Sequence, residues 1–311
     1  MKLRSLIADA DTVWRLPAAD AWRGYRALCW SAGPAGELAV LLVHRRHLER
    51  SPYIKGWPGW EPKVPFAGEL VIVVGQEERR VPVEDVRLRP SHLALLPGSR
   101  FLLVRGRTPR IGAEGRWAPN AVVLDPSGTS EAEFCIGDDI SALVTDAGGG
   151  IWTAYGDEGI HGGHPESGTG LAGWDSQGRN SWSPRGRLPD QPLEGGTAAT
   201  EDAEVWLVWD SSRGGTFLTR ITPSTGDVVS HPSPVPNLDG FAVSGKSAVL
   251  TRRDHDQRSV ELTRTEFDGT TWEATGSRRL RVPGRVVARC GQGRDGSLWL
   301  RAGDTWLRIE V

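Results

Sequence analysis

Two acids and two histidines lie close together in the chain, at Asp157, Glu158, His161 and His164. Carboxylates and imidazoles are the side chains that transfer protons in general acid–base catalysis. Histidines beside acids also supply nitrogen and oxygen ligands that zinc accepts. These four residues are therefore the candidate catalytic group, and the sequence allows a divalent metal without defining its ligands. The alternative is a solvated polar loop, since the stretch 146–166 is rich in glycine.

A second set of charged and aromatic residues is suited to binding. Arginine recognises carboxylate or phosphate groups, acids attract cations, and tryptophan offers stacking and apolar contact. The candidate ligand-binding residues are Arg45, Arg46, His47, Trp57, Trp60, Arg107, Trp117, Asp139, Asp239 and Arg253. If they share one surface, that surface is bipolar and fits a zwitterion, a carboxylated metabolite or a charged protein. The alternative is that the arginines and acids form ordinary surface salt bridges.

The elements that must position these residues are short strands. Apolar or alternating runs, as at 38–44, 205–210 and 297–302, are bounded by Gly, Asp, Pro or Ser, and helical periodicity is scarce. With 39 glycines and 21 prolines among 311 residues, many turns are expected. The sequence predicts an all-β fold whose core includes the strand tryptophans, namely Trp152, Trp174, Trp206, Trp209, Trp272, Trp299 and Trp306.

The strands repeat. A strand that leads into a turn or ends the chain begins near residues 69, 120, 170, 216, 260 and 305, in steps of 44–51 residues. An all-strand repeat of this length is typical of a propeller with four strands in each blade. We therefore expect one domain over 1–311, a six-bladed β-propeller of four-stranded antiparallel blades. The last repeat supplies only three strands, so the N-terminal strand KLRSLIAD, residues 2–9, is expected to close the ring.

This fold predicts where the polar residues lie. In a propeller the connections between the second and third strands of each blade emerge at one end, the top face. Here they are expected at 44–68, 107–119, 157–169, 210–215, 254–259 and 302–304. The candidate catalytic residues would lie on the third of these connections. Asp139 and Asp239 directly precede the first strands of the third and fifth blades, which brings them to the same rim.

Two motifs carry a family resemblance. The patterns DxxGxIWxxYxDEG at 146–159 and DGSLWL at 295–300 resemble repeats of two-component-regulator, NHL and SMP-30-like propellers. The first is also similar to uncharacterised actinobacterial propeller proteins. The resemblance implies the fold. Sugar lactonases and virginiamycin-lyase-type enzymes share related architectures and use a divalent metal near the axis, but their ligand sets do not match this sequence residue by residue, so that activity is not carried over.

Composition and motifs also argue against some functions. The net charge is −2 with no basic patch, so no nucleic-acid partner is expected. No apolar run is long enough to span a membrane, and three distant cysteines indicate reduced thiols in a cytoplasmic protein. GFAVSGKS at 240–247 fits the P-loop pattern, but strand-like residues follow it, so we interpret it as a hairpin and expect no nucleotide cofactor.

The sequence leaves three functions open. The favoured one is a binding module whose polar top-face pocket holds a small molecule or a partner protein. The second is a metabolite-modifying enzyme, a hydrolase, lyase or cyclase, that uses the acids and histidines at 157–164, with or without a divalent metal. The third is a scaffold without a ligand.

Overall fold

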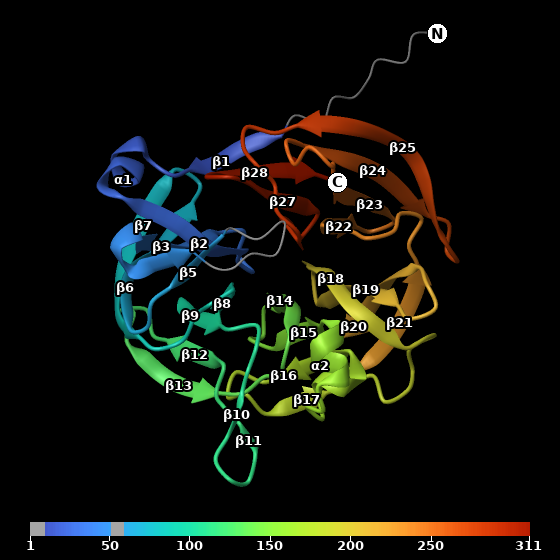
Figure 1. Cartoon of the computed structure of the whole chain (residues 1–311). Helices are drawn as coiled ribbons and strands as arrows, with labels where there is room; N and C mark the ends of the chain where they lie inside the picture. Colours follow the sequence, from blue (N-terminus) through green and yellow to red (C-terminus); the bar gives the residue numbers. More distant parts are fainter. Residues whose placement is uncertain (1–9, 51–58) are drawn as a thin grey trace.

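The computed structural model describes residues 10–50 and 59–311. Its strands form sheets arranged around a central axis (Figure 1). We call the strands nearest this axis the inner strands. The strand expected at 2–9 and the candidate ligand residue Trp57 lie outside the described residues.

Four sheets each contain four antiparallel strands. The first is β2 (Tyr25–Ala32), β3 (Leu38–His44), β6 (Phe66–Val74) and β7 (Glu77–Val86). The second is β8 (His92–Leu96), β9 (Arg100–Val104), β12 (Ala121–Leu124) and β13 (Ser130–Phe134). The third is β14 (Ile140–Thr145), β15 (Ile151–Tyr155), β16 (Leu171–Trp174) and β17 (Asn180–Trp182). The fourth is β22 (Gly240–Ser244), β23 (Ser247–Arg253), β24 (Ser259–Phe267) and β25 (Trp272–Arg281).

An eight-stranded sheet contains the remaining long strands. They are β18 (Pro192–Glu201), β19 (Glu204–Ser211), β20 (Thr216–Thr222), β21 (Asp227–Pro232), β26 (Gly291–Arg294), β27 (Ser297–Ala302), β28 (Thr305–Glu310) and β1 (Asp11–Arg15). β18 and β26 pair in parallel through two residue pairs, Ala199 with Gly293 and Thr200 with Arg294. β1 pairs antiparallel with β28.

The repeat read from the sequence corresponds to real strands. Each of its six marker segments lies in the third strand of a set, namely β6, β12, β16, β20, β24 and β28. Turns that begin with Asp and end with Gly follow some of these third strands. At the first of them Asp125 Oδ1 accepts hydrogen bonds from the backbone N–H groups of Ser127 (2.8 Å) and Thr129 (2.9 Å), and Gly128 has a φ of 89°. The P-loop match is the hairpin between β22 and β23, with Gly245 at a φ of 58°.

Aromatic side chains fill the space between neighbouring sheets. All seven tryptophans expected in the core are buried, and Trp209 and Trp306 are completely so. Trp306 packs against Trp14 of β1 with ring centroids 5.1 Å apart, and Trp152 packs against Trp182 at 5.6 Å. Each pair lies within one sheet and packs against the next: Trp14 and Trp306 share a core cluster with Leu38 of β3, and Trp152 and Trp182 share one with Trp209 of β19. Large flat rings bury much apolar surface in these clusters, which stabilises the packing of sheet on sheet.

Two inner-strand side chains tie the sheets together across the axis. Gln292 accepts a hydrogen bond from the Ala32 N–H (2.9 Å) and donates to the Leu143 carbonyl (3.4 Å). Arg294, 3% exposed, donates to the Ala32 carbonyl (2.9 Å), the Thr145 carbonyl (2.6 Å) and Thr200 Oγ1 (2.7 Å). Burial lowers the pKa of Arg294 to about 10, so its guanidinium is still charged at neutral pH.

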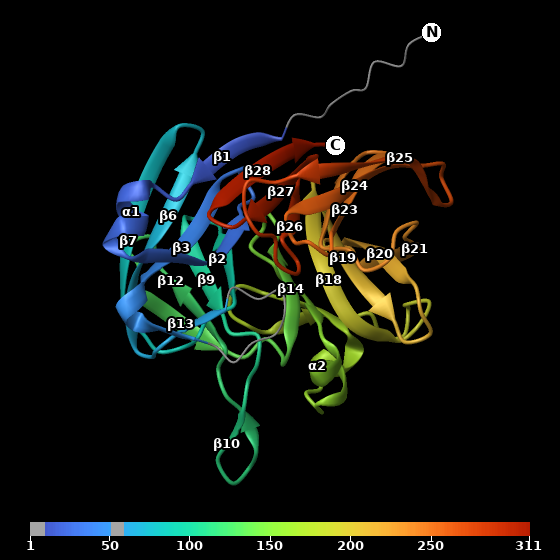
Figure 2. The same ribbon diagram turned by 45° about the horizontal axis from the view of Figure 1, so that its top comes forward.

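The connections between second and third strands carry short elements of their own. α2 (Asp157–His161) and η2 (Ser167–Thr169) occupy the connection at 157–169, and the hairpin of β10 (Arg110–Ile111) and β11 (Arg116–Trp117) occupies that at 107–119. α2 and β10 project from the same side of the ring (Figure 2). The connection expected at 157–169 therefore contains a short helix, which the acids in its first turn favour.

The other short elements are η1 (Arg45–His47), β4 (Leu48–Arg50) and β5 (Trp60–Pro62) in the connection after β3, and α1 (Ala18–Arg23) between β1 and β2. Over residues 10–50 and 59–311, none of the helices combines the length and the apolar character needed to traverse a lipid bilayer.

Candidate functional site

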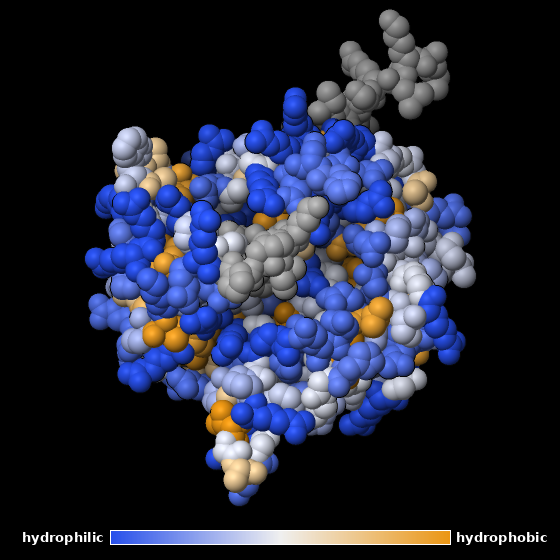
Figure 3. Space-filling view, viewed as in Figure 1, coloured by the Kyte–Doolittle hydropathy of each residue, from blue (hydrophilic) through white to orange (hydrophobic). Residues whose placement is uncertain are grey.

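A polar pocket of about 800 Å³ lies at the end of the ring that carries α2. Its lining comes from the starts of inner strands and from the connections between second and third strands. Seven acids line it (Glu61, Asp139, Asp157, Glu158, Glu194, Asp210 and Asp239), together with six arginines (Arg89, Arg105, Arg107, Arg252, Arg253 and Arg289). The visible side chains of this face are mostly hydrophilic (Figure 3).

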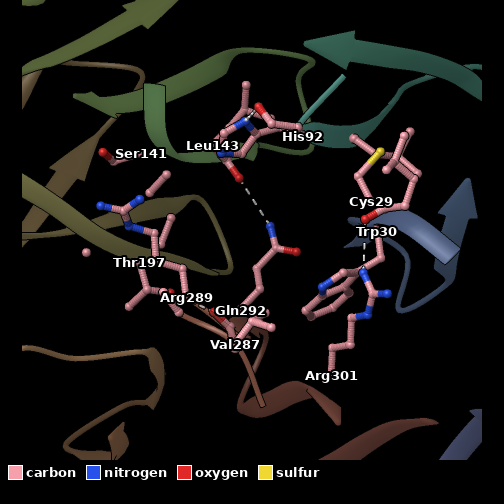
Figure 4. Close-up of a pocket in the computed structure, with 18 residues that line it drawn as sticks. Cys29, Trp30, His92, Ser141, Leu143, Thr197, Val287, Arg289, Gln292 and Arg301 are labelled. Carbon is pink, nitrogen blue, oxygen red and sulfur yellow. Dashed lines mark hydrogen bonds between the residues drawn. The ribbon is translucent and has the colours of Figure 1, made fainter. Parts of the chain in front are cut away.

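A smaller chamber of about 150 Å³ continues from the pocket along the axis. The two cavities share Ser91, Ser141 and Arg289 among their lining residues. Gln292 extends across the chamber to the Leu143 carbonyl (Figure 4). The pocket therefore leads into the core of the ring and reaches Gln292.

Glu194 is held at the junction of the two cavities. Ser141 Oγ donates a hydrogen bond of 2.9 Å to Glu194 Oε1, and Arg289 forms an ion pair with the same carboxylate. Burial raises the pKa of Glu194, although Arg289 opposes this by favouring the charged form. A carboxyl group whose pKa is raised in a pocket is a candidate for binding or for proton transfer.

Asp139 lies beside this group. Its backbone has a φ of 56°, and Oδ2 accepts a hydrogen bond from the Gly159 N–H of α2 (3.3 Å). Burial raises the pKa of Asp139, with Arg107 acting in the opposite direction. Arg107 itself is fixed between Asp138, at 3.1 Å, and Glu158.

Asp239 positions the opposite part of the rim. Its two carboxylate oxygens accept hydrogen bonds from the backbone N–H groups of Arg289 and Arg253, each at 2.9 Å. The Arg253 guanidinium lies 3.7 Å from the same carboxylate, and its buried Nη1 has no hydrogen-bond partner among the described residues. Asp239 therefore orients two pocket arginines as well as lining the wall.

Comparison with known proteins defines the fold. No family model and no curated protein matches the chain. A putative oxidoreductase (glucose dehydrogenase) from Thermus thermophilus has a similar structure, with a TM-score of 0.53 and 12% identity over 97% of this chain and 99% of that one. The chain has a β-propeller fold.

Two further solved structures are similar at lower TM-scores. The U3-55K structure gives 0.49 with 7% identity, covering 98% of this chain and 99% of that one. The RRP9 WD40 repeats give 0.48 with 8% identity, covering 98% of each chain. None of these comparisons carries the NHL, SMP-30-like or actinobacterial resemblance, which stays a prediction.

The propeller separates the four candidate catalytic residues. Asp157 and Glu158 line the pocket, whereas His161 is exposed at the end of α2 and is not part of the lining. His164 is buried and faces away, with Nε2 3.5 Å from Cys135 Sγ and Nδ1 3.2 Å from Glu166 Oε2. Burial lowers the pKa of His164 and so favours the neutral ring, with Glu166 acting in the opposite direction.

The candidate ligand-binding residues are also divided. Arg107, Asp139, Asp239 and Arg253 line the pocket, and Trp60 is 37% exposed beside the lining residues Glu61 and Pro62. Trp117 instead packs against His164 at 4.9 Å. Arg45, Arg46 and His47 form η1 and do not contribute to the pocket.

No group of three or more His, Cys, Asp or Glu residues that could hold a metal ion occurs in the part of the chain that the structure describes.

Sequence reasoning missed Glu194, Ser141, Arg105 and Arg289. Glu194 stands near the start of β18, the position that Asp139 and Asp239 hold relative to β14 and β22. β18 begins at Pro192 and ends at Glu201, so Glu194 is its third residue. Aligning the starts of the inner strands is the signal that would have found Glu194.

His92 is the first residue of β8 and lines the chamber. Its burial predicts that the stability of the protein depends on pH. Burial lowers the pKa of His92 from 6.5 to about 4, with Arg289 adding to the effect. Between pH 4 and pH 6.5 the His92 ring binds a proton more readily in the unfolded chain than in the folded protein. The free energy of unfolding therefore falls as the pH is lowered from 6.5 toward 4. We expect His92 to account for about 2 kcal/mol of that loss.

The measurement is urea denaturation of the wild-type and His92→Gln proteins at pH 7.5 and pH 4.5. Other histidines with lowered pKa values, His47, His164 and His231, are common to both proteins and cancel in the comparison. Equal acid sensitivity of the two proteins would contradict the prediction.

Proposed function

We propose that the chain is a six-bladed propeller that binds a small molecule in its polar pocket. The eight-stranded sheet divides into two blades, β18–β21 and β26–β28 with β1, since only two residue pairs join them. Added to the four separate sheets, these give six blades. β1 is then the outer strand that closes the ring.

One observation supports the binding function above all. The pocket has the volume of a small-molecule site, and most of its charged groups are held by ion pairs or hydrogen bonds to neighbouring residues. Such a preorganised, mixed-charge cavity suits a polar, charged metabolite more than the flat surface of a protein. The net charge of −2 continues to argue against nucleic acid.

The test is a thermal-shift screen of charged metabolites followed by calorimetry. A ligand should raise the midpoint of unfolding of the wild type, and the shift should vanish in Ala288→Trp, which fills the pocket where it meets the chamber. Arg179→Ala, at an exposed site outside the lining, is the control and should bind normally. Absence of any hit, together with capture of a protein at this face that Ala288→Trp abolishes, would replace the small molecule by a partner protein.

An enzyme that modifies the bound metabolite is the second candidate. It is favoured by two neighbouring pocket carboxyls, Asp139 and Glu194, whose pKa values are both raised by burial. Asp157 and Glu158 also line the pocket, so acids rather than His161 and His164 would carry the chemistry. Conversion of a screened ligand that Glu194→Gln abolishes without loss of binding would establish this function, and metal analysis would test for a divalent ion.

A cytoplasmic location belongs to the same proposal. Cys29 and Cys290 are buried and Cys135 is partly buried, and all three are free thiols.

A further inference from the structure

The charges of the pocket do not cancel. Among the described residues four lining acids pair with lining arginines, and Arg252 pairs with Glu261 at 2.9 Å. The four pairs are Glu61 with Arg89, Glu158 with Arg107, Glu194 with Arg289 and Asp239 with Arg253. Within residues 10–50 and 59–311, the lining groups left without a salt bridge are three carboxylates, Asp139, Asp157 and Asp210, and one guanidinium, Arg105.

The three carboxylates lie in the third blade and its neighbour. Asp139 directly precedes β14, Asp157 is the first residue of α2, and Asp210 belongs to β19. β14 and α2 both contact β18, the partner strand of β19, so the three positions form one wall of the pocket. Arg105 follows β9 in the second blade, on the other side of β14. The wall therefore has a surplus of negative charge.

These carboxylates keep hydrogen-bonding capacity. Asp139 accepts one bond, from the Gly159 N–H, and Asp157 accepts one, from the Glu158 N–H at 2.9 Å. Asp210 accepts one from the Thr216 hydroxyl. An ionised carboxylate has about four acceptor positions, so each of the three has room for a further donor.

We propose that the pocket binds a ligand through a protonated amine, which hydrogen-bonds to carboxylates of the wall formed by Asp139, Asp157 and Asp210. The proposal rests on the proposed binding function and names the class of ligand. An ammonium group brings three donors and a positive charge to acceptors that have no further partner among the described residues, and hydrogen bonds between charged partners are the strong ones. Arg105 is placed to receive an anionic group at the far end of the same ligand.

Binding of a cation is linked to the protonation of Asp139. Burial raises the pKa of Asp139, and an ammonium beside it favours the charged carboxylate. The other charged groups that act on Asp139 are Arg107, Asp138 and Arg289. At a pH where Asp139 is partly protonated, binding should therefore release protons, which calorimetry in two buffers of different ionisation enthalpy detects.

The test uses three probes with the same four-carbon length, namely butane-1,4-diamine, 4-aminobutanoate and succinate. Calorimetry should find binding of both amines and none of succinate. Asp139→Asn should weaken the binding of the diamine by about tenfold, because one charged hydrogen-bonding partner is lost. Asparagine tolerates the positive φ at this position, so the backbone is preserved. Asp227→Asn, an exposed change in the outer strand β21, is the matched control and should leave the affinity unchanged.

The outcomes separate this inference from the proposed function. Preferential binding of succinate, weakened by Arg105→Ala, overturns the amine assignment and leaves a small-molecule pocket. Amine binding that is unaffected by replacing all three aspartates with asparagine also overturns it, as does failure of both amines to bind at millimolar concentration. Failure of every screened compound, amines included, removes the small-molecule function as well.

Discussion

Replacing Arg294 with alanine is expected to lower the free energy of unfolding by about 4 kcal/mol, since it breaks a buried charged network and leaves its acceptors unpaired. The guanidinium bonds to backbone or hydroxyl oxygens of Ala32, Thr145 and Thr200. These residues belong to β2, β14 and β18, so a single side chain connects its own strand to three others around the axis.

Urea denaturation with a circular dichroism readout measures this loss. Arg281→Ala, an exposed change in the outer strand β25, is the control and should alter stability by less than about 0.5 kcal/mol. Arg294→Lys keeps the charge but replaces the planar fork by a single ammonium, so we expect a stability between those of the wild type and the alanine variant. A loss below about 1 kcal/mol for Arg294→Ala would show that water replaces these bonds.

Gly293→Ala is expected to cost about 3 kcal/mol through overpacking beside the axis. A methyl group there would lie 2.3 Å from the Phe241 carbonyl oxygen, 2.5 Å from the Ala199 side chain and 2.9 Å from the Ala242 Cα. Two of the three contacts are backbone atoms of β22, so relief requires β22 and β26 to move apart.

The matched control for this prediction is Gly276→Ala in β25. A methyl group at Gly276 meets no atom within 4 Å, and the position has no positive φ. We expect Gly276→Ala to be neutral or slightly stabilising, because alanine reduces the freedom of the unfolded chain. If both variants had the same thermal midpoint, the close packing at Gly293 would not matter for stability.

The strands could be predicted because their signals are local. Alternating apolar residues and four-residue turns that begin with Asp and end with Gly identify the hairpins after β12 and β16 without any knowledge of distant contacts. The strand that pairs with β28 has no such local signal, and the strand expected at 2–9 lies outside the described residues. The segment that pairs with β28 is Asp11–Arg15, which holds only two apolar residues, Val13 and Trp14, and is chosen by packing of Trp14 on Trp306. Such a long-range contact leaves no periodic pattern in the sequence.

The candidate site was predicted in part for the same reason. Asp139 and Asp239 were found because each directly precedes a clear inner strand. Glu194 was missed because β18 has irregular register between Gly195 and Ala198, which displaces the repeat. The direction of His164 depends on its contacts with Trp117 and Cys135, residues distant in the sequence, so its type and spacing suggested a role in the pocket that its position does not support.

The pairing of β1 with β28 has a mechanical consequence. Asp11 is opposite Arg308 and Arg15 is opposite Thr305, so the outward ends of the two strands lie at the same edge of the sheet. Tension applied between residues 11 and 308 would break the hydrogen bonds between β1 and β28 one after another from this end, rather than loading them all at once in shear. The contact between β1 and β28 would then open at low force, while the other sheets were still intact.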